Sequence, residues 1–92
     1  MSMSDVFAVT KTEDSTVYAG RARVRQVQVL ASASGSPAII LKDGGSGGTA
    51  RLTLAFSTSS VHSVNIPDNG ILFDTDVYLD LTDCDSVTVF LS

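Results

Sequence analysis

Residues 77–92, VYLDLTDCDSVTVFLS, decide the fold. Two runs in this stretch alternate between apolar residues and mostly polar ones. The apolar members are Val77, Leu79 and Leu81 in the first run and Val87, Val89 and Leu91 in the second. A period of two places every second side chain on the same side of an extended chain, so each run predicts a half-buried β-strand. The Asp83-Cys84-Asp85 segment between them is predicted to turn, because aspartates bond their own backbone in turns.

The same alternation recurs along the whole chain, while helix-forming periodicity is nearly absent. It predicts strands at residues 6–10, 16–18, 21–31, 38–42, 50–56, 61–66, 71–73, 76–81 and 87–91. Gly, Pro, Asp, Asn and Ser fill the breaks, at residues 13–15, 34–37, 43–45, 67–70 and 83–85. We therefore expect an all-β protein, a single small antiparallel β-sandwich or jelly-roll-like domain of about eight to nine short strands over residues 1–92. Residues 1–4 are expected to be a flexible N-terminus and residues 43–49 a glycine-rich loop.

In the strand predicted at residues 21–31, the apolar residues switch from even to odd positions partway along. Ala22 and Val24 share one side, whereas Val27, Val29 and Ala31 have the opposite parity. A β-bulge near Arg25 and Gln26 would bring both apolar sets to the core. The alternative is a strand buried in part on each face.

Size and composition restrict the function classes. With 92 residues the domain has a thin core, and Cys84 is its only cysteine, so neither an intrachain disulfide nor a multi-cysteine zinc site is available. Oligomerisation is the remaining common source of extra burial, so we expect a homo-oligomer. The net charge of −4 argues against nucleic acid as a partner. The sequence shows no signal peptide and no apolar run long enough for a membrane span, so we expect synthesis in the cytoplasm and no membrane partner.

Catalytic, cofactor and metal signatures are weak. The glycines of DGGSGGT, residues 43–49, lack the Lys-Ser or Lys-Thr pair and the helix of a phosphate-binding loop, which favours a hairpin tip. Asp74, Asp76, Asp80, Asp83 and Asp85 form the densest acidic group. A calcium loop would need glycine where Leu79 stands.

His62 has no recognisable nucleophile partner, and we expect adjacent carboxylates to raise the pKa of the Cys84 thiol. We predict no enzyme, no cofactor and no metal. A small hydrolase with paired carboxylates is the least supported hypothesis.

Charged residues suggest an interface. Arg21, Arg23 and Arg25 share one parity, and Asp76, Tyr78 and Asp80 share the outward parity of another strand. The arginines of one subunit are predicted to meet the acidic face of another subunit or of a partner. The alternative is an edge strand whose charges discourage aberrant pairing.

The segments VYAGRARVRQVQV, AIILKDGGSGG and NGILFDTDVYLDLTDCDSVTVFL resemble small structural proteins of tailed bacteriophages, particularly those of marine bacteria. The resemblance covers most of the chain from Val17 onward. It implies a non-enzymatic virion protein: a head decoration or cement protein that binds the major capsid protein and stabilises the shell, with a trimer expected at three-fold positions. The alternative is a receptor- or glycan-binding module of the tail or fibre.

Overall fold

The computed structural model describes residues 6–66 and 70–92, which form nine β-strands and contain no helix. The strands are β1 (Phe7–Lys11), β2 (Ser15–Tyr18), β3 (Ala22–Ala31), β4 (Ala38–Asp43), β5 (Thr49–Ala55), β6 (Val61–Asn65), β7 (Ile71–Phe73), β8 (Val77–Thr82) and β9 (Cys84–Leu91). Each lies within a few residues of a strand predicted from the alternation. The all-β fold class is confirmed. The predictions for residues 1–4 and 67–69 fall outside the described residues.

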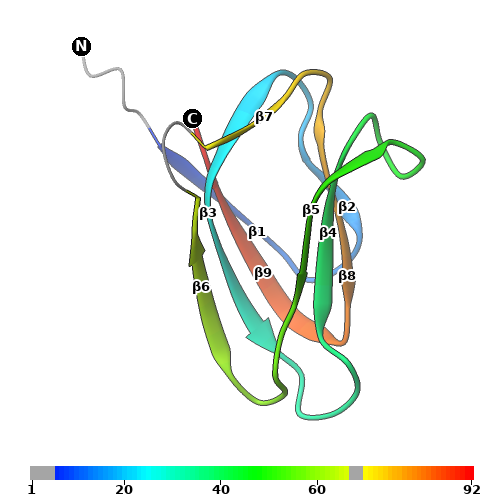
Figure 1. Ribbon diagram of the computed structural model, residues 1–92, viewed down its shortest axis with the longest axis vertical. Coiled ribbons are helices and arrows are strands. Elements are labelled where there is room, and N and C mark those ends of the chain that lie inside the picture. Colours follow the sequence, from blue (N-terminus) through cyan, green and yellow to red (C-terminus); the bar gives the residue numbers. More distant parts are fainter. Residues whose placement is uncertain (1–5, 67–69) are drawn as a thin grey trace.

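The strands form two antiparallel sheets that pack face to face (Figure 1). Sheet A has the order β1-β9-β3-β6, with β7 also pairing with β3, and sheet B has the order β2-β8-β4-β5. Because β6 and β7 pair with successive parts of β3, they act as one interrupted strand. With β6 and β7 counted as one strand, the pairs nest within one another along the chain: β1 with β9, β2 with β8, β3 with β6 and β7, and β4 with β5. This nested order is a jelly roll.

The β-bulge predicted in β3 is present. The pairing of β3 with β9 shifts register between Val24 and Gln26, so Arg25 is the extra residue. As a result Ala22 and Val24 before the shift, and Val27 and Val29 after it, are all buried. The alternative of a strand buried in part on each face is wrong.

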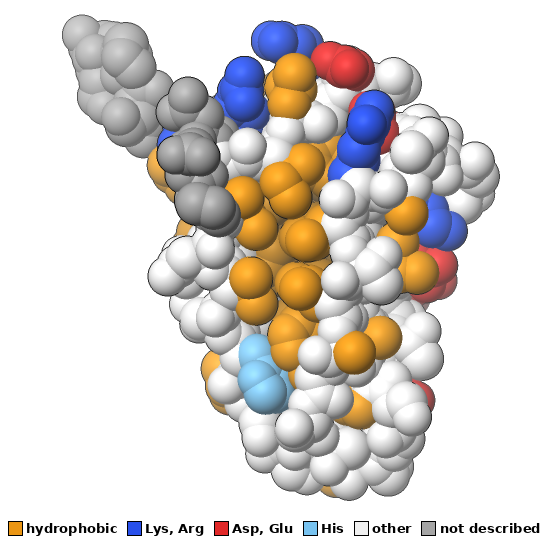
Figure 2. All heavy atoms as spheres, in the orientation of Figure 1, with side chains coloured by type: hydrophobic (Ala, Val, Ile, Leu, Met, Phe, Trp, Pro, Cys, Tyr) orange, Lys and Arg blue, Asp and Glu red, His pale blue; other side chains and the backbone are white. Residues whose placement is uncertain are grey.

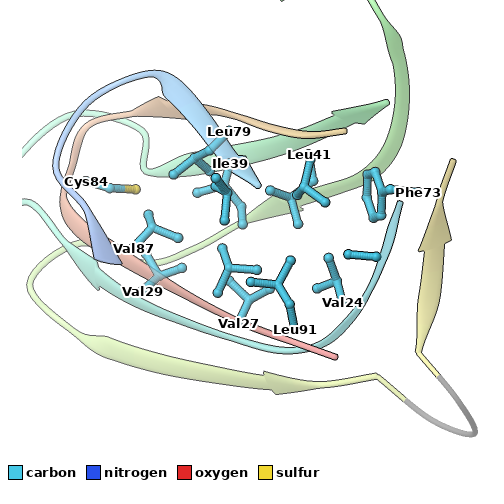
Figure 3. Packing of buried hydrophobic residues seen from close by; sticks show 14 residues of the cluster. Val24, Val27, Val29, Ile39, Leu41, Phe73, Leu79, Cys84, Val87 and Leu91 are labelled. Atoms are coloured by element: carbon cyan, nitrogen blue, oxygen red, sulfur yellow. The ribbon is translucent and has the colours of Figure 1, made fainter. Parts of the chain in front are cut away.

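The core lies between the two sheets (Figure 3). Sheet A contributes mostly valines, and sheet B contributes Ile39, Leu41 and Leu79, which face them. Valine is the residue type that a pleated, half-buried surface favours. The core therefore consists of the alternating apolar positions of both sheets.

The corner between β8 and β9 is tighter than predicted. Asp83 alone makes it, with φ of 52°, whereas Cys84 and Asp85 already belong to β9. The Asp83 carboxylate accepts a hydrogen bond from the Ser36 amide at 2.9 Å. Gly35 has φ of 93°, a conformation that strains any residue with a side chain, and a Cβ there would also meet the Asp83 carboxylate, so glycine is favoured.

Candidate interaction surfaces

A buried carboxylate, Asp43, holds together the end of the domain that carries the β4–β5 hairpin. Its side chain is only 5% exposed, and Arg51 lies 3.2 Å from Oδ2. The carboxylate also accepts the backbone N–H groups of Asp74 at 3.0 Å, Thr75 at 2.9 Å and Asp76 at 3.4 Å. Asp43 therefore fixes the turn that leads from β7 in sheet A to β8 in sheet B.

These hydrogen bonds stabilise the charged form of Asp43. They lower the pKa of its carboxyl group from 3.8 to about 2; the amides of Asp74 and Thr75 contribute most, and burial opposes them. The sequence placed Asp43 only in a turn, because its amide partners are 31–33 residues away along the chain.

The three arginines predicted at an interface gather where β3 begins. Arg21 lies just before β3 instead of within it, and its Nε is 3.8 Å from Asp74 Oδ1. Both side chains of this pair are about two-thirds exposed, so the pair contributes little to stability. Arg23 and Arg25 lie within β3, and Arg25 Nε donates to Ser92 Oγ at 2.7 Å.

The acidic residues predicted to face the arginines lie elsewhere. Tyr78 and Asp80 are on the outer face of sheet B, because Val77 and Leu79 between them point into the core. Asp80 forms an ion pair with Lys42 at 3.3 Å. Asp76 precedes β8 instead of lying within it, and its Oδ1 accepts the amides of two hairpin glycines at 2.9 and 3.0 Å. The arginines do not meet these carboxylates within one chain, and their pairing between chains stays a prediction.

The outer face of sheet A is a broad surface whose described residues carry no charge between the bulge at Arg25 and Asp85. Cross-strand register identifies its residues, since paired residues share a face. They are Ala8 and Thr10 of β1, Thr88 and Phe90 of β9, Gln26, Gln28 and Leu30 of β3, and Val61, Ser63 and Asn65 of β6. Val61 is 71% exposed and Leu30 is 42% exposed. Arg23 and Arg25 border this face at one end, and Asp85 borders it at the other.

The remaining singled-out residues have structural surroundings. The glycines of residues 44–48 join β4 to β5, as predicted for a hairpin tip. The His62 ring stacks on Phe56 with ring centroids 4.8 Å apart, and its Nε2 lies 3.3 Å from the Ser57 carbonyl oxygen. Cys84 is buried, and burial raises the pKa of its thiol more than Asp83 and Asp85 do.

The acidic group of the sequence separates in space. Asp74 and Asp76 lie at the hairpin end of the domain, and Asp83 and Asp85 lie beyond the opposite end of β8. Within residues 6–66 and 70–92, no three His, Cys, Asp or Glu side chains are grouped as a metal site would require. The described part of the chain also contains no helix able to span a membrane.

No protein-family model, curated protein or solved structure matches the chain.

Proposed function

We propose that this chain is a non-enzymatic structural protein of a bacteriophage virion, a head decoration or cement protein that binds the capsid shell through the outer face of sheet A. The observation that carries the proposal is that the described residues of this face carry no charge between Arg25 and Asp85, in a chain with 16 charged residues among 92. Uncharged surfaces with scattered apolar residues lose little solvation energy on docking. Valine, leucine and phenylalanine side chains supply the apolar contact area.

The resemblance to phage structural proteins supplies the partner. The jelly-roll topology is compatible with it, because viral capsid domains are among the proteins that use this topology, although fold alone assigns no function. Arg23 and Arg25 would set the register against carboxylates of the shell. Three copies around a local three-fold axis would share the contact, in keeping with the oligomer expected for a small core.

Cryo-electron microscopy of particles of the phage that encodes the chain tests the location. We expect density for this domain, with sheet A against the head shell. Density confined to the tail would support the receptor- or glycan-binding alternative, for which the exposed Phe7–Tyr18 ring pair is the favourable observation. Absence from the particle would overturn both assignments.

Two charge variants test the surface. Gln28→Glu places a carboxylate at the centre of the outer face of sheet A, and Thr53→Glu places the same charge on an exposed outward position of sheet B. We expect Gln28→Glu to weaken binding to head shells by about tenfold or more, since burying an unpaired charge is costly. Thr53→Glu should bind within about twofold of the wild type. Equal loss in both variants would contradict the use of sheet A.

A further inference from the structure

An apolar strip remains uncovered where the two sheets part at β5 and β6. Figure 2 shows hydrophobic side chains running along the molecule between these strands, with His62 at one end. We define the apolar strip as the partly buried residues Leu52, Leu54, Phe56, His62, Val64, Ile66 and Ile71. It draws on both sheets.

The strip residues face the core but are only partly buried. Leu52 is the cross-strand neighbour of Leu41, and Val64 is the neighbour of Val27; both neighbours are fully buried. Paired residues point to the same side of a sheet, so the strip residues also point inward. They stay partly exposed because, within residues 6–66 and 70–92, no strand lies beside β5 or β6 on this side of the sandwich.

The β6 edge can accept another strand. The Ser60 carbonyl accepts from Ala31, and the Ile66 amide donates to Arg25, at either end of β6. Hydrogen bonding alternates along an antiparallel pair, so the backbone groups of Val61, Ser63 and Asn65 point away from β3. No residue of β6 is Lys, Pro or an acid, which are the usual devices against edge pairing.

The area of the strip indicates which kind of partner it can bind. Five strand residues span about 17 Å and two packed sheets lie about 10 Å apart, which gives roughly 170 Å². A stable complex of two globular surfaces buries about 800 Å² on each partner. The strip alone is therefore too small to join two copies face to face. One extended strand matches its width and length, and it gains backbone hydrogen bonds as well.

We propose that the open side of the sandwich binds an extended strand supplied by a partner protein. The strand pairs with β6 through the backbone of Val61, Ser63 and Asn65. It is uncharged and carries apolar side chains at every second position, which lie against Leu52, Leu54 and Phe56. The proposal does not depend on the head-shell assignment, because sheet A docks through its outer face and the strand enters at the edge.

Amide hydrogen exchange measured by NMR tests the proposal. The probe is a short capped peptide of alternating valine and threonine, and the control peptide has the same composition with its valines in one block. With the alternating peptide, exchange should slow by about tenfold or more at Val61, Ser63 and Asn65 and stay unchanged along β1. Protection along β1 to the same extent, or equal protection by both peptides, would overturn the proposal.

Variants of β6 and of the strip complete the test. Ser63→Pro removes an outward amide and should weaken peptide binding by about tenfold or more, whereas Ser63→Thr should bind as the wild type does. Leu54→Gln leaves the backbone intact and should also weaken binding. Unchanged binding of Leu54→Gln would overturn the proposal. So would protection of β6 that rises with protein concentration in the absence of peptide, because a second copy would then occupy the strip.

Discussion

The two open edges of the sandwich, one at β1 and β2 and the other at β5 and β6, differ in how closely the sheets meet. On the side of β1 and β2, the two sheets contact each other, and the rings of Phe7 and Tyr18 lie 5.5 Å apart at an angle of 53°. On the side of β5 and β6, the stacked rings of His62 and Phe56 join the sheets at one end, and the apolar strip is exposed along the rest of this side. Both sides follow the same alternation in sequence. Alternation therefore defines which residues face inward, while the packing of edge strands decides whether those residues are covered.

The largest expected effect comes from a cross-strand pair of leucines. Leu41→Ala should lower the free energy of unfolding by about 3 kcal/mol, because it leaves a cavity in a fully buried site. Leu52→Ala, its neighbour in the apolar strip, should lower it by about 1 kcal/mol, since the side chain is already partly in water. Urea denaturation measures both. Equal losses would mean that the open side is as well covered as the core.

The next effect concerns Asp43, whose hydrogen bonds hold the turn between β7 and β8. Asp43→Asn removes the charge that accepts three backbone N–H groups, and it should lower Tm by about 5–10 °C at neutral pH. The folded pKa of about 2 lies below the ordinary 3.8, so the charged carboxylate stabilises the fold above about pH 4. This contribution is lost as pH falls towards 2.

Thermal unfolding followed by circular dichroism between pH 2 and pH 7 measures this difference. The Tm gap between the wild type and Asp43→Asn should close at the acidic end. A gap that stays constant with pH would show that Asp43 acts through packing instead of charge.

A smaller effect is expected at the contacting side. Phe7→Ala should cost about 1 kcal/mol, because it removes a ring pair that lies across the two sheets. A double-mutant cycle with Tyr18→Ala should show a coupling of about 0.5–1 kcal/mol. Additive losses would mean that the two rings do not join the sheets.

The smallest effect is expected at the exposed ion pair. Arg21→Ala should change the free energy of unfolding by less than about 0.5 kcal/mol, since both partners are largely in water. Urea denaturation at low and high salt checks this value. A loss above 1 kcal/mol would show that Arg21, through its ion pair with Asp74, helps to hold the turn whose amides donate to Asp43.

The sequence predicted every strand, and it predicted the bulge because Val24 and Val27 differ in parity. The hydrogen bonds of Asp43 could not be predicted, since they join turns that only the folded chain brings together. The separation of Asp76 from Asp85 is of the same kind, because a six-residue strand, β8, lies between them. The sequence could suggest which charged residues form an interface, but it could not show on which face of the molecule they lie. Strand order decides which sheet carries the arginines.

The exposed strip was also beyond the sequence. Leu52 and Val64 have the same alternating pattern as the buried Leu41 and Val27. Only the topology shows that β5 and β6 are the last strands of their sheets.

The pairing of β1 with β9 governs when the protein can fold. Sheet A has β9 between β1 and β3, so the first strand of the domain can join the sheet only through the last one. A chain without Val87, Val89 and Leu91 lacks three of the 14 buried core residues, and β1 and β3 each lose β9 as a pairing partner. Because its strand pairings join residues far apart along the chain, we expect folding to be slow for a domain of this size, and a chain truncated before β9 should fail to fold.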